Sequence, residues 1–202
     1  MNDPTSQVDR RLEELVQMAL QIGADAIDVV AISPSDISVE DDLANFCREP
    51  RCGYYGLSAN CPPYVSGPSG FRELLKICKH ALAIKMEVPL GTYLTDEQYD
   101  ILKFTHETVA GIERLAVELG YSNSKAFAAG NCKVFFCREY DRCRVLTGGE
   151  CRHPQHARPS MSSSGINVYE LKKTAGWLMN RDTNEANPDP KMEAVYGLVL
   201  IG

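Results

Sequence analysis

Cysteine is the residue type in this chain whose placement most clearly indicates chemistry. Seven of the eight cysteines fall into two short segments that are rich in glycine and proline. Thiolates hold iron–sulfur clusters and are common ligands of zinc. We therefore predict that metal is bound by Cys47, Cys52 and Cys61 in the first segment and by Cys132, Cys137, Cys143 and Cys151 in the second.

The spacing of these cysteines favours iron over zinc. The first segment has the pattern C-x4-C-x8-C and ends in Cys61-Pro62-Pro63, and proline directly after a ligating cysteine is typical of bacterial ferredoxin motifs. The second has the pattern C-x4-C-x5-C-x7-C and supplies four thiolates, the full set for one 4Fe-4S or 2Fe-2S cluster or one tetrahedral zinc ion. Neither contains the C-x2-C pair usual in zinc ribbons and fingers. We expect one or two iron–sulfur clusters of the 4Fe-4S type that serve electron transfer or small-molecule chemistry. The alternative is zinc, which would make the protein a zinc-stabilised structural or protein-interaction module.

The first segment has one thiol fewer than a cluster of four irons needs. Three cysteines would leave one iron free to bind a small-molecule substrate. Alternatively, Cys78 or another residue completes the set, and both clusters then serve electron transfer or structure. Cys78 follows Phe71 and Leu74 at helical spacing, which indicates a small buried side chain instead. The sequence leaves both alternatives open.

Two histidines and an arginine follow the last cysteine. We interpret His153 and His156 as hydrogen-bonding neighbours of the metal ligands, and Arg158 as compensation for the negative charge of a thiolate cluster. We interpret His80 and His106 as structural. The chain has no P-loop, dinucleotide-binding, zincin or serine-hydrolase motif, so whether the protein is an enzyme is left undecided.

Charge and hydropathy indicate the kinds of partner and compartment. The net charge is −6, which argues against a nucleic-acid partner because such proteins present a basic face. The sequence has no N-terminal signal pattern and no run of roughly 18 apolar residues that would span a membrane. We therefore expect a cytoplasmic protein whose thiols stay reduced instead of forming disulfides. Its partner is expected to be a redox protein or a small molecule.

The hydrophobic pattern predicts alternating helices and strands. At 202 residues and 44% hydrophobic content, one core is the default, so we expect a single domain over residues 1–202. Helices are expected at about 8–22, 71–78, 99–119 and 168–177, and strands at about 26–32, 82–88, 125–129 and 196–201. This order predicts an α/β fold with a small, mainly parallel or mixed sheet covered by helices, and cysteine loops at about 47–63 and 130–165. If the strands before the two loops are parallel, both loops lie at one edge of the sheet and the two metal sites are neighbours.

A series of motifs in a fixed order resembles one known family. The series is Cys47, Cys52-Gly-Tyr-Tyr-Gly, Cys61-Pro-Pro, Gly130-Asn-Cys132, Cys151-Arg-His-Pro, Arg158-Pro-Ser-Met161 and Gly165-Ile-Asn167. It is similar to the prokaryotic family called domain of unknown function 2284, over residues from about 24 to 177. The resemblance implies a metal-binding protein, with an iron–sulfur cluster favoured, and it implies no particular substrate.

Overall fold

A four-stranded antiparallel sheet forms the centre of the fold. The computed structural model describes residues 4–23, 27–49, 52–178 and 191–202. The sheet order is β1-β2-β4-β3, and every neighbouring pair is antiparallel. The expected start of the first strand at Ala26 lies outside the described residues. The strands are β1 (Ile27–Ile32), β2 (His80–Pro89), β3 (Lys125–Phe127) and β4 (Met192–Ile201).

The prediction of a mainly parallel or mixed sheet is wrong. Ile32 at the end of β1 pairs with Ala81 near the start of β2, and Pro89 at the end of β2 pairs with Met192 at the start of β4. The connection from β1 to β2 therefore re-enters the sheet at the end that it left. The residues after β2, 90–124, instead carry the chain to the opposite end, where Lys125 of β3 lies opposite Leu200 of β4. Alternating helices and strands do not specify the end at which a connection re-enters the sheet. The hydrophobic pattern thus predicted the elements and not their directions.

One face of the sheet is covered by two long helices, α1 (Pro4–Gly23) and α5 (Gln98–Glu118). Leu15 of α1 and Ile112 of α5 are fully buried in the same cluster as Ile84 of β2. The buried positions Leu15 and Ala19 of α1 are four residues apart, as expected for an amphipathic helix. Helix α5 is more deeply buried, because its residues from Thr108 to Ile112 are all buried. The two long helices expected from the sequence are therefore confirmed.

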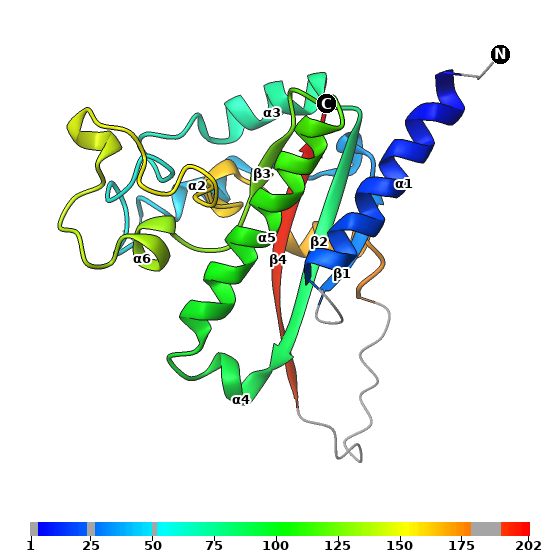
Figure 1. Cartoon of the computed structure of the whole chain (residues 1–202). Coiled ribbons are helices and arrows are strands. Elements are labelled where there is room, and N and C mark those ends of the chain that lie inside the picture. The colour runs from blue at the N-terminus through cyan, green and yellow to red at the C-terminus, as the bar shows by residue number, and fades with distance from the viewer. Residues whose placement is uncertain (1–3, 24–26, 50–51, 179–190) are drawn as a thin grey trace.

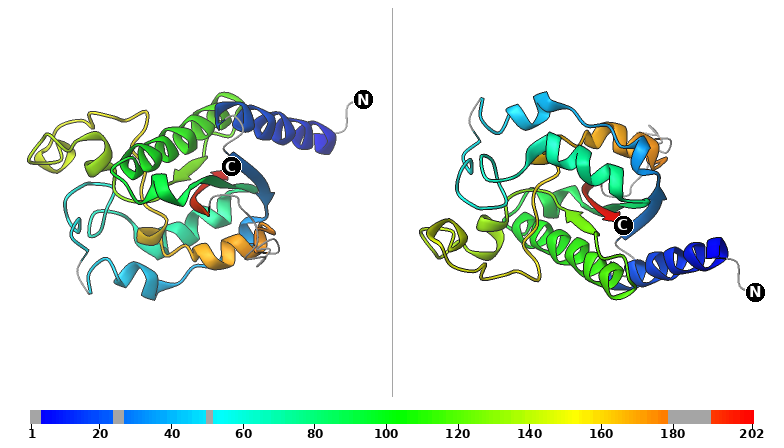
Figure 2. Two further views of the ribbon diagram at one scale, coloured as in Figure 1. Left: turned by 90° about the horizontal axis from the view of Figure 1, so that it is seen from below. Right: turned by 90° about the horizontal axis from the view of Figure 1, so that it is seen from above.

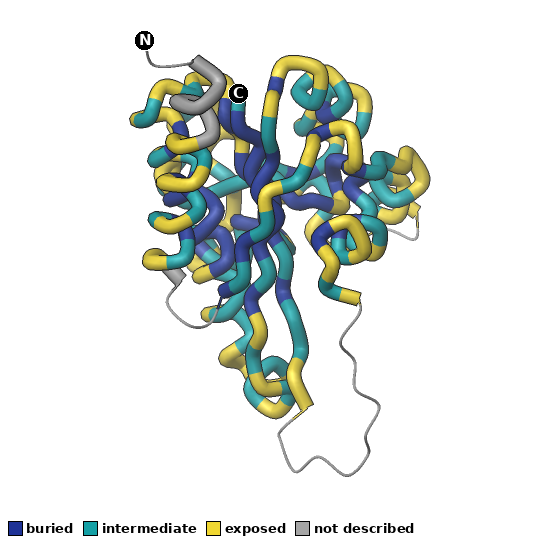
Figure 3. Tube along the Cα trace, turned by 90° about the vertical axis from the view of Figure 1, so that its right-hand side faces the viewer, coloured by how far each residue is buried: buried dark blue, intermediate teal, exposed yellow. Residues whose placement is uncertain are grey.

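The opposite face is covered by α3 (Gly67–Ile77) and α7 (Val168–Thr174). The ring of Phe71 in α3 meets the ring of Phe127 in β3 edge to face, with the centroids 4.9 Å apart. Fully burying a side chain of this size contributes about 1.5–3 kcal/mol. Figure 2 shows the resulting three layers, and Figure 3 shows that the strands are the most buried part of the chain. None of the described helices is long and apolar enough to cross a membrane.

The cysteine segments lie beside the β3 edge of the sheet, on the side away from α1 (Figure 1). They contain little regular structure, so their shape depends on contacts between them and with the sheet. The short elements of the chain are α2 (Asp41–Asn45), α4 (Leu90–Tyr93), α6 (Cys132–Phe136) and the 3-10 turns Pro34–Asp36, Val145–Thr147 and Ser162–Ser164.

Cys78 lies apart from the other seven cysteines. Helix α3 ends at Ile77, so Cys78 sits just past the helix in extended backbone and not on the helical face that the sequence predicted. Its predicted burial is confirmed, because it is only 7% exposed and belongs to the cluster that also contains Phe71 and Ala81. Its position therefore supports a packing role.

Candidate metal centres

Crossed hydrogen bonds join the two cysteine segments. The side-chain amide of Asn131, in the second segment, donates to the sulfur of Cys61 in the first, with 2.9 Å between the atoms. In return, the amide of Asn60 in the first segment donates to the sulfur of Cys132 in the second at 3.5 Å. Each asparagine directly precedes one cysteine and hydrogen-bonds to the other. The two groups of cysteines are therefore neighbours.

The neighbouring positions agree with the expectation, but the reason given for it is wrong. Strands β1 and β3 run in opposite directions, so their carboxyl ends do not share an edge of the sheet. Strand β3 ends at Phe127, opposite Leu198 in the middle of β4, and the chain then turns toward the first segment. The turn depends on Gly130, which has a φ of +77°; a Cβ there would also lie 2.7 Å from the ring of Phe135.

Both polar atoms of the Asn131 side-chain amide form hydrogen bonds. Asn131 is the residue before α6, and its side-chain oxygen accepts a hydrogen bond from the backbone N–H of Lys133 at 2.7 Å. This is the usual way to cap the start of a helix. The amide nitrogen is then directed at Cys61. The side chain of Lys133 in turn donates to the carbonyls of Cys137 and Tyr140, which holds the following turn.

A buried ion pair anchors the end of the second segment to α5. The guanidinium of Arg158 lies 2.9 Å from a carboxylate oxygen of Glu113, and the two side chains are 11% and 13% exposed. The same carboxylate accepts from the backbone N–H of Ala126 in β3. Arg158 also donates to the carbonyls of Pro154 and Ala157. The interpretation of Arg158 as compensation for cluster charge is therefore replaced by a structural one, because Glu113 already neutralises it.

The stretch after Arg158 ties both segments to the sheet. Ala128, just beyond β3, exchanges backbone hydrogen bonds with Pro159 and Met161. Further on, the carbonyl of Gly165 accepts from the backbone N–H of Glu40, which leads into α2 and the first segment. Gly165 has a φ of +73°, and a Cβ there would lie 2.7 Å from the carbonyl oxygen of Glu40. These contacts give a structural reason for the Arg158-Pro-Ser-Met161 and Gly165-Ile-Asn167 motifs.

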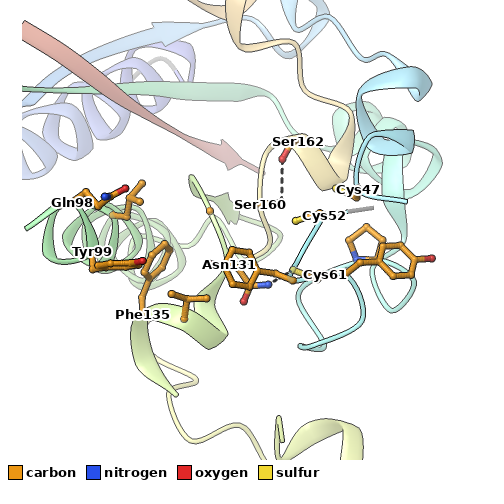
Figure 4. Close-up of a pocket in the computed structure, with 15 residues that line it drawn as sticks. Cys47, Cys52, Cys61, Gln98, Tyr99, Asn131, Phe135, Ser160 and Ser162 are labelled. Carbon is orange, nitrogen blue, oxygen red and sulfur yellow. Dashed lines mark hydrogen bonds between the residues drawn. The ribbon is translucent and has the colours of Figure 1, made fainter. Parts of the chain in front are cut away.

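Three cysteines line one cavity, which we call the first cavity. It has a volume of about 250 Å³, and Cys47, Cys52 and Cys61 lie on one side of it. Figure 4 shows these cysteines across the cavity from Gln98, Tyr99 and Phe135, with Asn131 between the two sides. The other lining residues are Tyr54, Tyr55, Pro62, Leu102, Gly130, Val134, Ser160 and Ser162.

The remaining four cysteines of the two segments line a second cavity, of about 220 Å³. These are Cys132, Cys137, Cys143 and Cys151, and the lining also contains Arg144, Arg152 and His153. The grouping into three and four that the sequence predicts is thus the grouping that the fold produces. Cys78 lines neither cavity. Among the described residues, no three histidine, cysteine or acidic side chains lie close enough to hold a single metal ion.

Burial suppresses the ionisation of most of these thiols. It raises the pKa of Cys61 to about 11. A hydrogen bond with Ser58 acts to lower this pKa, whereas the nearby thiols of Cys132, Cys47 and Cys52 act to raise it further. Burial likewise raises the pKa values of Cys47, Cys132 and Cys137. A thiol becomes a thiolate in such a place when a cation compensates the charge, as a bound metal does. A metal bound by these thiols would therefore have to displace their protons.

Cys143 is the exception among the thiols of the second cavity. Burial acts to raise its pKa, but backbone N–H groups of Ala59, Leu146 and Val145 and the charge of Arg152 outweigh this, so its pKa lies below the ordinary value. Several N–H groups directed at one sulfur stabilise a thiolate. Ala59 belongs to the first segment, so the first segment helps to shape the second cavity as well.

A comparison with protein families matches residues 30–201 to the predicted metal-binding proteins called domain of unknown function 2284. The chain belongs to this family. The description agrees with the two thiol-lined cavities, although it specifies neither the metal nor a reaction. No curated protein and no solved structure matches the chain.

Three histidines of this family member surround the ring of Phe136 at the wall of the second cavity. The centroids of His153, His156 and His106 lie 5.4, 6.0 and 5.7 Å from that of Phe136. His153 lines the second cavity, and its backbone N–H donates to the sulfur of Cys151 at 3.4 Å. The role expected for His153 beside the metal ligands fits this position. His156 is not part of the lining.

Sequence reasoning gave no role to the asparagines that join the two cysteine segments. Asn60 and Asn131 hydrogen-bond to cysteines 72 and 70 residues away. One signal for them was present, because the dipeptide Asn-Cys occurs once in each segment, at Cys61 and at Cys132. A repeated polar residue before a predicted ligand suggests a hydrogen-bonding role, although the sequence does not say which sulfur accepts the bond.

Proposed function

We propose that the protein binds two neighbouring 4Fe-4S clusters that differ in function. The second is held by Cys132, Cys137, Cys143 and Cys151 and has no free iron position. The first is held by Cys47, Cys52 and Cys61 and leaves one iron facing the first cavity. The observation that carries this proposal is the presence of separate cavities lined by three and by four cysteines. On this proposal, electrons from a redox partner protein serve small-molecule chemistry at the first centre.

The spread of the thiols supports a cluster over a single zinc ion. A zinc ion draws its sulfur ligands to about 2.3 Å from one point, whereas a 4Fe-4S cluster is held by cysteines placed around a larger core. In the second segment the thiols surround a cavity of about 220 Å³. The N–H groups directed at Cys143 also suit a cluster, because such hydrogen bonds tune the charge on its sulfur ligands.

The residues of the chain support different roles for the two centres. When bound, clusters supply one-electron chemistry and, at an iron without a cysteine, a position for a substrate atom. Asn60 and Asn131 hold the two centres next to each other. Arg144 and Arg152 lie at the second cavity, where positive charge favours the more negative, reduced state. The first cavity has space beside its cysteines for a substrate.

The open position can be tested by adding cyanide to the reduced protein and recording its electron paramagnetic resonance spectrum. We expect cyanide to change the spectrum of the wild type and of Cys143→Ser, in which the first centre is intact. The spectrum of Cys61→Ser is expected not to respond. Equal spectra with and without cyanide in the wild type would contradict the open iron. A colourless protein with stoichiometric zinc would contradict the clusters altogether.

A further inference from the structure

The first cavity lies between the three cysteines and the start of α5. Gln98 and Tyr99, in the first turn of α5, lie across the cavity from Cys52 and Cys61 (Figure 4). Leu102 of the same helix also lines the cavity. A molecule in the cavity would therefore contact the sulfur side and the helix side together. This arrangement resembles a binding pocket more than a packing defect, because its walls come from distant parts of the chain.

The described lining of the first cavity contains no acidic or basic side chain other than its thiols and phenols. None of its fifteen residues is Asp, Glu, Lys, Arg or His. Arg138 lies 5.4 Å from the centroid of the Tyr99 ring but is not part of the lining. The second cavity, by contrast, contains Arg144 and Arg152. An anion in the first cavity would lose its hydration without gaining a cation, which is costly.

The remaining lining groups suit a flat ring with a polar substituent. Tyr99 and Phe135 present aromatic rings, Leu102 and Val134 add apolar surface, and Ser162 adds a hydroxyl. Aromatic pairs gain stability from stacked or edge-to-face contacts. The volume of about 250 Å³ lies at or below the lower end of the range for ligand pockets, roughly 300–1,000 Å³. The same volume also has to contain any cluster held by the three cysteines, so the space that is left fits at most a molecule of about one ring.

We propose that the first cavity binds a small, uncharged, planar ring molecule whose polar substituent lies between the three cysteines and α5. This proposal rests on the proposed function in one respect, namely that the substituent would meet the open iron there. The shape and the neutral lining of the cavity belong to the chain itself. Binding can therefore be measured separately from the identity of the metal.

Benzamide and benzoate provide the test, because they share one ring and nearly one shape but differ in charge. We expect isothermal titration calorimetry on the protein as purified to show at least tenfold tighter binding of benzamide than of benzoate. Filling the cavity by Leu102→Trp should weaken benzamide binding at least tenfold. Ser162→Trp, at an exposed position of the lining, should do the same if the first variant does not fold. Tyr169→Ala is the control, because Tyr169 is 60% exposed on α7 and does not line the cavity.

Several results would overturn this proposal. They are the absence of benzamide binding, benzoate binding as tight as benzamide, or unchanged benzamide binding in a folded cavity-filling variant. Iron and inorganic sulfide are measured in the same samples. Tight benzamide binding by a protein without iron would reject the proposed function and keep the ligand site. Iron and sulfide in a protein that does not bind benzamide would reject the ligand site and keep the proposed function.

Discussion

Replacing Asn131 with aspartate should weaken the first centre, although Asn131 is adjacent to a cysteine of the second. Aspartate keeps the side-chain oxygen that accepts from Lys133 at the start of α6, so the helix cap remains. It removes the N–H group that lies 2.9 Å from the sulfur of Cys61 and puts a carboxylate oxygen there. Asn131 is only 5% exposed, so little water can replace the lost donor.

The expected loss follows from the strength of a hydrogen bond to a charged group. Such a bond contributes about 1.5–3 kcal/mol, which corresponds to about 10–150-fold weaker retention of metal at the first centre. Repulsion between the new carboxylate and the thiolate adds to this, so the figure is a lower bound. Asn60→Asp is the matched control. The hydrogen bond from Asn60 to Cys132 is longer, at 3.5 Å. Asn60→Asp should therefore weaken the second centre, and by less than Asn131→Asp weakens the first.

Metal release to a chelator measures this effect one centre at a time. Cys143→Ser serves as the background for the first centre and Cys52→Ser as the background for the second. We expect Asn131→Asp to speed metal loss in the Cys143→Ser background and to have little effect in the Cys52→Ser background. If Asn131→Asp instead speeds loss from the second centre alone, the crossed hydrogen bonds do not support the centres, and the reasoning fails.

Three further experiments test other parts of the structure. Cys137→Ser should lose the metal of the second centre, whereas Cys78→Ser should keep all metal. Metal analysis after gel filtration measures both, and metal loss in the Cys78 variant would reject the grouping of the cysteines into three and four. Burial lowers the pKa of His106 to about 4, so the folded protein favours the neutral imidazole. The stability that this neutral side chain contributes is complete above about pH 6.5 and is lost as the pH falls toward 4. The loss is about 3 kcal/mol, and His106→Gln should flatten the dependence of the unfolding free energy on pH over this range. Arg158→Met should destabilise the fold by about 3–5 kcal/mol, because it leaves Glu113 buried without its partner; urea unfolding measures this, and the added change Glu113→Gln should recover part of the loss.

The sequence predicted the elements and the grouping of cysteines well, because both depend on local patterns. The helical spacing of residues such as Leu15 and Ile112 is a property of one segment, and so is the spacing within each group of cysteines. Residues close in sequence usually lie close in space, and the cysteines of each group line one cavity.

The directions of the strands and the contacts between segments could not be predicted in the same way. Whether Ala81 pairs with Ile32 in parallel or antiparallel fashion depends on where a long connection re-enters the sheet. The pairing of Arg158 with Glu113 joins residues 45 positions apart, and an arginine near cysteines suggested charge compensation more readily than an ion pair with a helix. The bond from Asn131 to Cys61 is a contact of the same long-range kind.

The most direct test of the central claim is the amount of iron, zinc and inorganic sulfide in the protein purified without oxygen. Two 4Fe-4S clusters require about eight irons and about eight sulfides per chain, with a brown colour. Cys52→Ser and Cys143→Ser should each retain about half of both. A colourless protein that contains zinc and no sulfide would contradict the account.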